Sequence, residues 1–269
     1  MPLNWMDVSA VPFDAILLLE RVQIGWFRGW DFPKPEISIA LAAHPHVCWY
    51  IRHKAPEMAG WVSDRLAEAH ALFEKNEPPD AVEIRRAEQK VLASLEDLLV
   101  YALDPSIYDH QPFLAWDSNE LTGLIDFTGK TVIDVGSGTG RLAFTAAPLA
   151  KTVYAVEPVG NLRDFIREKA RALGLSNVYA VDGLITAIPY ADNFADVTMG
   201  GHVFGDFLEA EAAELERVTK PGGMIILCPG NNDSDNDIHR FLVGRGYQWG
   251  AFEEPRDGGK RKYWKVCEG

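Results

Sequence analysis

Three glycines spaced two residues apart carry the clearest chemical meaning in this sequence. A short apolar run, 132–135, leads directly into Gly136, Gly138 and Gly140. A strand that ends in such a loop lets a ligand lie against bare backbone, where any side chain would collide. The next apolar run ends in Glu157, an acid that can accept hydrogen bonds from both ribose hydroxyls of a nucleoside. The spacing therefore predicts a nucleoside-containing cofactor.

The position of the third glycine helps to identify the class of cofactor. A dinucleotide-binding fingerprint reads G-x-G-x-x-G, whereas here the third glycine comes one residue early and Arg141 stands in the expected place. A third apolar run, 178–181, is followed by Asp182 and Gly183. The carboxylate of Asp182 is suited to accept a hydrogen bond from an adenine amino group. A Lys-Pro-Gly-Gly sequence at 220–223 then precedes another long apolar run.

Together these four motifs make the segment from about 131 to 266 resemble the class I S-adenosylmethionine-dependent methyltransferases. Within that class it is most similar to the broad group called methyltransferase type 11. The resemblance covers about half of the chain and says little about residues 1–110. It implies an α/β fold, with a Rossmann-like, seven-stranded, mostly parallel sheet that closes with an antiparallel C-terminal hairpin. It also implies S-adenosyl-L-methionine as the cofactor.

The resemblance assigns cofactor-binding roles along the chain. Asp134 is expected to order the glycine loop and to meet the cofactor ammonium, although a strand-end acid can also serve only to bind loop amides. Tyr108, in an aromatic segment before the first strand, is a candidate lid residue, with a hydrophobic seam between domains as the alternative. The complete set of expected cofactor-binding residues is Tyr108, Asp134, Gly136, Ser137, Gly138, Gly140, Glu157, Asp182, Gly183 and Gly201.

His202 follows the fourth strand, at the position that faces the reacting centre in this family. Histidine titrates near neutral pH, so His202 is the candidate general base. Many relatives use this position only for packing. Catechol-type methyltransferases place a magnesium-binding acid here, but this chain has Gly200 and Gly201, so no metal is expected. The Asn-Pro-Pro-Tyr sequence of amino-methylating DNA enzymes is absent as well.

Composition restricts the partners. The 269 residues carry a formal net charge of −13, which disfavours nucleic acid and anionic membrane surfaces because both are polyanions. Three separated cysteines indicate a reducing compartment without a disulfide framework. No targeting segment or membrane span is recognisable. We expect a cytoplasmic protein with a small-molecule partner. The oligomeric state is undetermined, and the aromatic residues of the helical part are compatible with a homodimer contact.

Helical periodicity dominates the first hundred residues. Asp14 is expected to cap a helix that runs to about Phe27, a second helix to span 57–75, and a third to run from Asp80 to about 102. Strands and helices alternate from Thr131 onward, which indicates a parallel sheet covered on both faces. We therefore divide the chain into a helical domain, residues 1–104, and a cofactor-binding domain, residues 105–269, that ends in a hairpin at 247–254 and 261–267.

One cluster in the helical domain contains residue types that bind transition metals, namely His44, His46, Cys48 and His53. Its spacing matches no common zinc pattern. A place in the substrate pocket for Tyr50 or His53 is the preferred alternative, and the cluster's role stays open.

The sequence as a whole predicts an S-adenosylmethionine-dependent methyltransferase acting on an oxygen, nitrogen or carbon nucleophile of a small molecule. The helical domain is expected to cover the site and select the substrate. Two alternatives are kept. One is a non-catalytic protein that binds S-adenosylmethionine or S-adenosylhomocysteine as a regulator or scaffold. The other, less favoured, is an NAD-dependent oxidoreductase.

Overall fold

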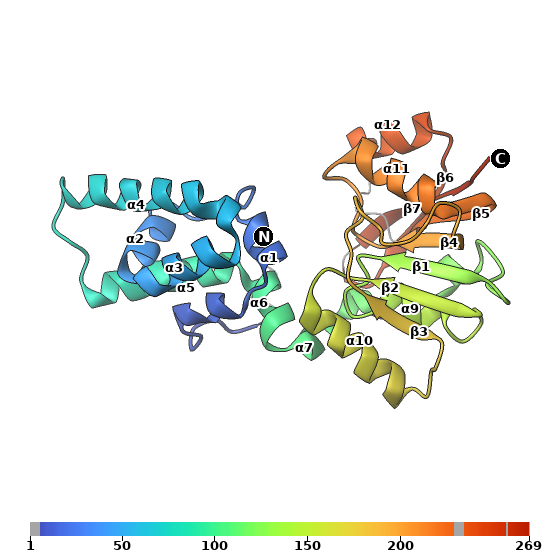
Figure 1. The fold of residues 1–269 in the computed structure, drawn as a ribbon, viewed down its shortest axis with the longest axis horizontal. Helices are drawn as coiled ribbons and strands as arrows, with labels where there is room; N and C mark the ends of the chain where they lie inside the picture. The colour runs from blue at the N-terminus through green and yellow to red at the C-terminus, as the bar shows by residue number, and fades with distance from the viewer. Residues whose placement is uncertain (1–5, 229–233, 257, 269) are drawn as a thin grey trace. The chain divides into compact units, whose positions relative to one another are not determined.

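The computed structural model describes residues 6–228, 234–256 and 258–268. It divides the chain into two compact units, one ending at Tyr108 and one beginning at Asp109. Figure 1 shows a helical unit, coloured blue to green, and an α/β unit, coloured green to red.

The first unit is built from helices around one apolar core. Phe13, Ile24 and Ile51 are fully buried in this core. Helix α2 packs against both α4 and α5. The elements are η1 (Phe13–Leu18), α1 (Arg21–Trp26), α2 (Glu36–Ala43), α3 (Pro45–Lys54), η2 (Pro56–Met58), α4 (Ala59–Phe73), α5 (Ala81–Ser94), α6 (Glu96–Leu103) and α7 (Pro105–Asp109). None of the described helices is long and apolar enough to cross a lipid bilayer.

The predicted start of the helix after Asp80 is confirmed. The Asp80 side chain accepts hydrogen bonds from the amides of Val82 (2.9 Å) and Glu83 (2.8 Å), and Glu83 accepts one from the Asp80 amide (3.0 Å). This reciprocal pairing satisfies amide groups that the first turn of a helix leaves without partners.

Two predicted helices are interrupted. Asp14 does not cap a helix that reaches Phe27, because it lies inside the 3-10 turn η1, and the extended Leu19 separates this turn from α1. The long helix from Asp80 to about residue 102 is also divided, since α5 ends before Leu95 and α6 begins after it. The Trp30 indole donates to the Ser94 carbonyl (2.8 Å), so a side chain distant in sequence binds the backbone where the helix breaks.

The second unit contains a seven-stranded sheet in the order β3-β2-β1-β4-β5-β7-β6. Neighbouring strands from β1 to β5 pair in parallel, whereas β7 is antiparallel to both β5 and β6. The predicted fold class is therefore confirmed, including the C-terminal hairpin. The strands are β1 (Thr131–Val135), β2 (Thr152–Val156), β3 (Val178–Val181), β4 (Ala195–Gly200), β5 (Thr219–Leu227), β6 (Gln248–Glu254) and β7 (Gly258–Val266).

Helices cover both faces of this sheet (Figure 1). Leu142 of α9 and Ile166 of α10 belong to one buried cluster, whereas Leu215 of α11 and Leu242 of α12 belong to another. Helix α10 ends just before Gly174, which has a left-handed φ of 67°. The remaining elements are η3 (Pro112–Leu114), α8 (Asn119–Thr122), α9 (Arg141–Ala146), α10 (Gly160–Ala172), α11 (Leu208–Val218) and α12 (Asp237–Gly244).

The topology brings distant residues to one edge of the sheet. Strands β1 to β5 are parallel, so their carboxyl ends meet at the same edge. Strand β6 is antiparallel to β7, which is itself antiparallel to β5. The last residue of β6, Glu254, therefore also lies toward the edge where the glycine loop follows β1.

Candidate functional site

The glycine loop turns back sharply from β1 into α9. Gly136, Gly138 and Gly140 have φ angles of 64°, 56° and 89°, a region that residues with a Cβ rarely adopt. The Gly136 amide donates to the Val156 carbonyl (2.8 Å), and the Gly140 amide donates to the Ser137 carbonyl (2.7 Å). These bonds join the loop to the end of β2 and close the turn before the helix.

Close packing also requires glycine at two of these positions. A Cβ on Gly136 would overlap the side chain of Val203 and lie 2.9 Å from the Val203 Cβ. A Cβ on Gly140 would lie 2.5 Å from Cε2 of Phe144. At Gly136 and Gly140, the bare backbone of the loop is thus packed against the protein's own side chains.

Asp134 is the buried acid at the end of β1. Its Oδ2 accepts a hydrogen bond from the Ala143 amide of α9 (2.9 Å), and its carbonyl accepts one from the Ser137 hydroxyl (2.7 Å). Burial raises the pKa of the Asp134 carboxyl to about 8, and the nearby charge of Glu157 adds to the effect. Asp134 therefore binds a backbone amide, as the alternative reading of this acid required, and carries a proton at neutral pH.

Glu157, immediately after β2, is equally well enclosed. One carboxylate oxygen accepts from the Gly138 amide (2.9 Å) and the other accepts from the Val159 amide (2.9 Å). The side chain thus binds the glycine loop and the start of α10 at once. Glu157 is therefore a hydrogen-bond acceptor at the point where the glycine loop and α10 meet.

Asp182 differs from these two acids because its side chain is 75% exposed. It forms an ion pair with Arg163 of α10 (3.1 Å), and the same guanidinium donates to the Glu157 carbonyl (2.8 Å). Arg163 therefore connects the ends of β2 and β3. Gly183 follows in a tight position, since a Cβ there would lie 2.7 Å from Val156 Cγ1.

His202 lies in the bend after β4, next to Gly201, and has a left-handed φ of 54°. Its Nε2 lies 3.4 Å from Oε2 of Glu254. The other oxygen of that carboxylate, Oε1, lies 2.6 Å from Nη1 of Arg141. The Arg141 guanidinium stacks over the ring of Trp116, with 4.5 Å between Cζ and the ring centroid. The candidate base therefore belongs to a row of charged groups from three separate elements.

Glu254 is the residue of this row that the sequence did not reveal. It directly follows another glutamate, Glu253, in the hairpin, and no local pattern distinguishes the two. Arg141 was noticed only because it occupies the place of a glycine. Their pairing depends on α9 and β6 meeting in the folded unit.

Other predicted site residues lie in the helical unit. Tyr108 packs edge-to-face on Tyr101, with ring centroids 5.2 Å apart. The last residue of the helical unit is Tyr108 itself, so its role as a lid stays a prediction. The Tyr50 hydroxyl donates to the Leu19 carbonyl (2.8 Å), which gives this side chain a structural partner.

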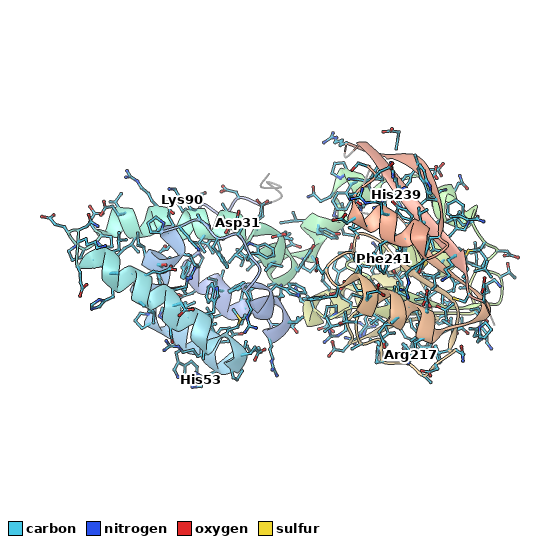
Figure 2. The ribbon with its side chains drawn as sticks, turned by 90° about the horizontal axis from the view of Figure 1, so that it is seen from above. Asp31, His53, Lys90, Arg217, His239 and Phe241 are labelled. Atoms are coloured by element: carbon cyan, nitrogen blue, oxygen red, sulfur yellow. The ribbon has the colours of Figure 1, made fainter. Side chains whose placement is uncertain are left out.

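The cluster of histidines and cysteine does not converge on one point. His44 and His46 each contact a carboxylate, Glu88 (2.7 Å) and Asp14 (2.6 Å) respectively. Ligand atoms of Asp14 and both histidines lie within 4.8 Å of one another. The other two members are separate, since Cys48 donates to a backbone carbonyl in the core. His53 stacks on Trp49 at the surface of the unit (Figure 2).

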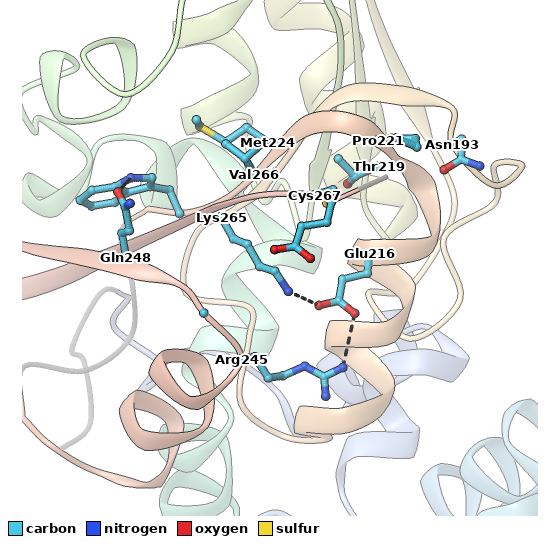
Figure 3. Close-up of a pocket in the computed structure, with 13 residues that line it drawn as sticks. Asn193, Glu216, Thr219, Pro221, Met224, Arg245, Gln248, Lys265, Val266 and Cys267 are labelled. Carbon is cyan, nitrogen blue, oxygen red and sulfur yellow. Dashed lines mark hydrogen bonds and ion pairs between the residues drawn. The ribbon is translucent and has the colours of Figure 1, made fainter.

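A cavity of about 690 Å³ lies at the opposite edge of the sheet. Thr219 and Pro221, at the start of β5, and Cys267, after β7, line it (Figure 3). Glu216 pairs there with Lys265 (2.9 Å) and with Arg245 (3.3 Å). Because it borders the amino end of β5, this cavity is distinct from the site beside the glycine loop.

The family model described as a methyltransferase domain matches residues 133–227. This segment runs from β1 to the end of β5 and includes the glycine loop, both buried acids and His202. Residues 133–227 belong to the methyltransferase domain family. The predicted resemblance to class I methyltransferases is thereby confirmed, and it implies S-adenosyl-L-methionine as the cofactor of the domain.

Curated relatives match the methyltransferase domain at moderate identity. A demethylmenaquinone methyltransferase from Geobacillus kaustophilus is 31% identical over 130 residues, which cover 45% of this chain and 54% of that protein. A cypemycin N-terminal methyltransferase from a Streptomyces species is 32% identical over 143 residues, with coverage of 46% and 56%. The chain thus spans about half the length of the curated relatives that it matches.

A solved structure shares the fold. A chain of the complex that contains the Haloferax volcanii Trm112 methyltransferase activator aligns with a TM-score of 0.52 and 12% identity. The alignment covers 63% of this chain and 96% of that one. The arrangement of strands and helices in the methyltransferase domain is therefore one that solved proteins also adopt.

The glycine loop of the methyltransferase domain also contains a polar atom suited to a ligand. The Thr139 side chain is 1% exposed, and its hydroxyl has no hydrogen-bond partner among the described residues. A buried hydroxyl without a partner is unfavourable. Together with the carboxylates of Asp134 and Glu157, it gives the loop a donor and acceptors that fit a polar cofactor.

Proposed function

We propose that this chain is an S-adenosyl-L-methionine-dependent methyltransferase that acts on an oxygen, nitrogen or carbon nucleophile of a small molecule. The observation that carries the proposal is the position of Asp134 and Glu157. Both acids are buried at the carboxyl edge of the sheet and both contact the glycine loop or the helix that follows it. This arrangement lies within a segment that belongs to the methyltransferase domain family.

The residues at this edge suit the parts of the cofactor. The Asp134 carboxylate would face the ammonium of the methionine part, and the buried Glu157 carboxylate, which accepts from the Gly138 and Val159 amides, would accept from the ribose hydroxyls. Asp182 and Gly183 would border the adenine. The group bound there supplies a methyl on a sulfonium sulfur, which keeps the electron pair of the broken carbon–sulfur bond.

His202 is the proposed general base. Methyl transfer to a neutral acceptor releases a proton, and an imidazole at this edge can take it as the new bond forms. Holding the two reactants in line supplies much of the rate, since orientation of this kind is worth roughly 7–11 kcal/mol. The protein therefore acts mainly by positioning and proton removal.

A small-molecule acceptor agrees with the charge of the chain and with one relative. A formal net charge of −13 disfavours a polyanion such as nucleic acid. One matching relative is a demethylmenaquinone methyltransferase. We further propose that the helical unit selects the acceptor, because the family match begins only at residue 133 and leaves that unit outside it.

Isothermal titration with S-adenosylmethionine, S-adenosylhomocysteine and NAD tests the cofactor. Wild type should bind the first two at micromolar concentration and not NAD. Asp182→Ala should weaken binding about fivefold, because it removes one hydrogen bond of about 1 kcal/mol. Asp192→Ala is the matched control, because Asp192 is likewise exposed and paired with an arginine, Arg217 (2.9 Å), but precedes β4 instead of following a strand. Binding of NAD alone would overturn the proposal.

Methyl transfer itself is then measured with methyl-labelled S-adenosylmethionine and a panel of phenols, amines and quinols. Labelled product from any of them supports the proposed activity. Cofactor binding without transfer to any acceptor would favour the non-catalytic binding protein instead.

A further inference from the structure

We propose that Glu254 and Arg141 are positioning residues for His202, with the Glu254 carboxylate holding the imidazole so that Nδ1 faces the methyl acceptor. This inference rests on the proposed function, because it assigns the device that orients the proposed base. The three residues come from the end of β6, the start of α9 and the bend after β4.

The exposed fraction of the side chain increases from Glu254 through Arg141 to His202. The Glu254 side chain is fully buried, that of Arg141 is 9% exposed, and that of His202 is 32% exposed. An ionised carboxylate is stable in such an enclosure only when a positive or donating group pairs with it. Arg141 pairs with one oxygen and His202 lies at the other, and of the three side chains the histidine has the largest exposed fraction.

Two aromatic rings also contact Arg141. Its guanidinium lies 4.5 Å from the Trp116 ring centroid and 5.9 Å from that of Phe113. Such cation–π contacts are stronger when they are shielded from water. The guanidinium therefore provides a fixed anchor for Oε1 of Glu254, which leaves Oε2 directed at His202.

The charge state of Glu254 agrees with this arrangement. Burial by itself would raise the pKa of the carboxyl, but the contacts with His202 and Arg141 outweigh burial and leave the Glu254 pKa below its usual value. Glu254 is thus ionised at neutral pH. An ionised carboxylate can accept the Nε2–H of His202 and stabilise the imidazolium once the ring is protonated.

The backbone of His202 also indicates that its position is imposed by the surroundings. A left-handed φ of 54° in a residue other than glycine is strained. Nε2 is the ring nitrogen next to Glu254, 3.4 Å from Oε2 at ion-pair distance and without hydrogen-bond alignment, whereas Nδ1 has no hydrogen-bond partner among the described residues. It is therefore the nitrogen available to accept a proton.

In the proposed step, one proton moves from the methyl acceptor to His202 and then to water. As the acceptor forms its bond to the methyl carbon, its proton moves to Nδ1 of His202, and the ring becomes an imidazolium paired with Glu254. The imidazolium then returns the proton to water through its exposed side. Glu254 keeps its charge throughout, as does Arg141.

The first test is a nuclear magnetic resonance spectrum of the imidazole N–H protons, which are visible only when hydrogen bonding protects them from exchange with water. Wild type should show an Nε2–H signal that His202→Gln removes. Glu254→Leu should lose that signal. Glu253→Gln is the matched control, because Glu253 is the adjacent exposed glutamate on the same strand, and it should keep the signal.

A second variant distinguishes loss of the contact between Glu254 and His202 from misfolding. Glu254→Leu leaves Arg141 buried without its carboxylate, so the double variant Glu254→Leu/Arg141→Met replaces both charges with apolar side chains, a change that buried ion pairs often tolerate. The folded double variant should also lack the His202 signal. A signal that persists unchanged in it would overturn the proposal, whether or not methyl transfer has been found.

The second readout is methyl transfer to an acceptor found in the panel. Glu254→Gln should lower kcat roughly 10–100-fold, whereas the affinity for S-adenosylmethionine should not change. An unchanged kcat in this variant, or full activity in His202→Gln, would refute the assigned roles even if the ring signal behaves as expected.

Discussion

Binding of S-adenosylmethionine should release a proton from Asp134. The pKa of this carboxyl is raised to about 8 in the folded protein, first by burial and then by the charge of Glu157. The cofactor ammonium favours the ionised form of a neighbouring carboxyl and should draw its pKa back toward the ordinary value of about 3.9. The protonated acid therefore has to ionise when the ligand binds.

The size of the effect follows from the two pKa values. At pH 7 a carboxyl with a pKa of about 8 is about 90% protonated, so binding should release about 0.9 of a proton. At pH 8 the release should fall to about 0.5, and at pH 9 to about 0.1. Over the same range, the affinity should rise with pH.

Calorimetry in two buffers measures this release directly. The observed enthalpy of binding depends on the ionisation enthalpy of the buffer in proportion to the protons released, so titrations in phosphate and in Tris at equal pH give their number. Asp134→Asn, which cannot ionise but can still accept from the Ala143 amide, should release none. A wild-type enthalpy that is the same in both buffers at pH 7 would refute the reasoning about Asp134.

Four further outcomes are expected. Without ligand, the free energy of unfolding of wild type should decrease as pH rises from about 4 to about 8. The reason is that the unfolded chain loses the Asp134 proton near its ordinary pKa while the folded chain retains it. Denaturant unfolding at several pH values should show a weaker decrease in Asp134→Asn. Gly136→Ala should lower the free energy of unfolding by at least about 1 kcal/mol more than Gly129→Ala does. Both glycines have a positive φ, but only Gly136 is packed against Val203. Equal losses of stability in the two variants would contradict the packing argument. Arg141→Met should cost about 3–5 kcal/mol, because the buried Glu254 carboxylate loses its guanidinium partner, whereas loss of an exposed ion pair costs about 0–1 kcal/mol. A thermal midpoint near that of wild type would show that the pair is unimportant. All three buried cysteines should resist a thiol reagent until urea unfolds the chain, and rapid labelling of the native protein would contradict their burial.

Much of the fold was predictable because its signals are local. The left-handed position of Gly174 and the capping box at Asp80 each depend on a few adjacent residues. The same holds for the glycine loop, where the turn needs backbone angles that favour glycine. The alternation of apolar runs and helices predicted the parallel sheet, and the Gly-Gly pair near the end predicted the hairpin.

Helix interruptions were less predictable. The apolar stripe from Asp80 onward continues through Leu95 without a break in its periodicity, yet the helix divides there. The hydrogen bond from Trp30 to the Ser94 carbonyl explains the difference. Periodicity indicates which face of a helix is buried but cannot show that a distant side chain binds its backbone.

The sequence by itself determined the family of the domain, the alternation of its strands and helices, and the acids that follow the strands. Those features rest on residues that are close together in the chain. Only the tertiary structure decided which of two adjacent glutamates is buried, that Asp182 pairs with Arg163, and that Glu254 lies between Arg141 and His202. The physical reason is that ion pairs and burial depend on distances in space, and these distances are set when β6 closes the sheet and α9 packs across it.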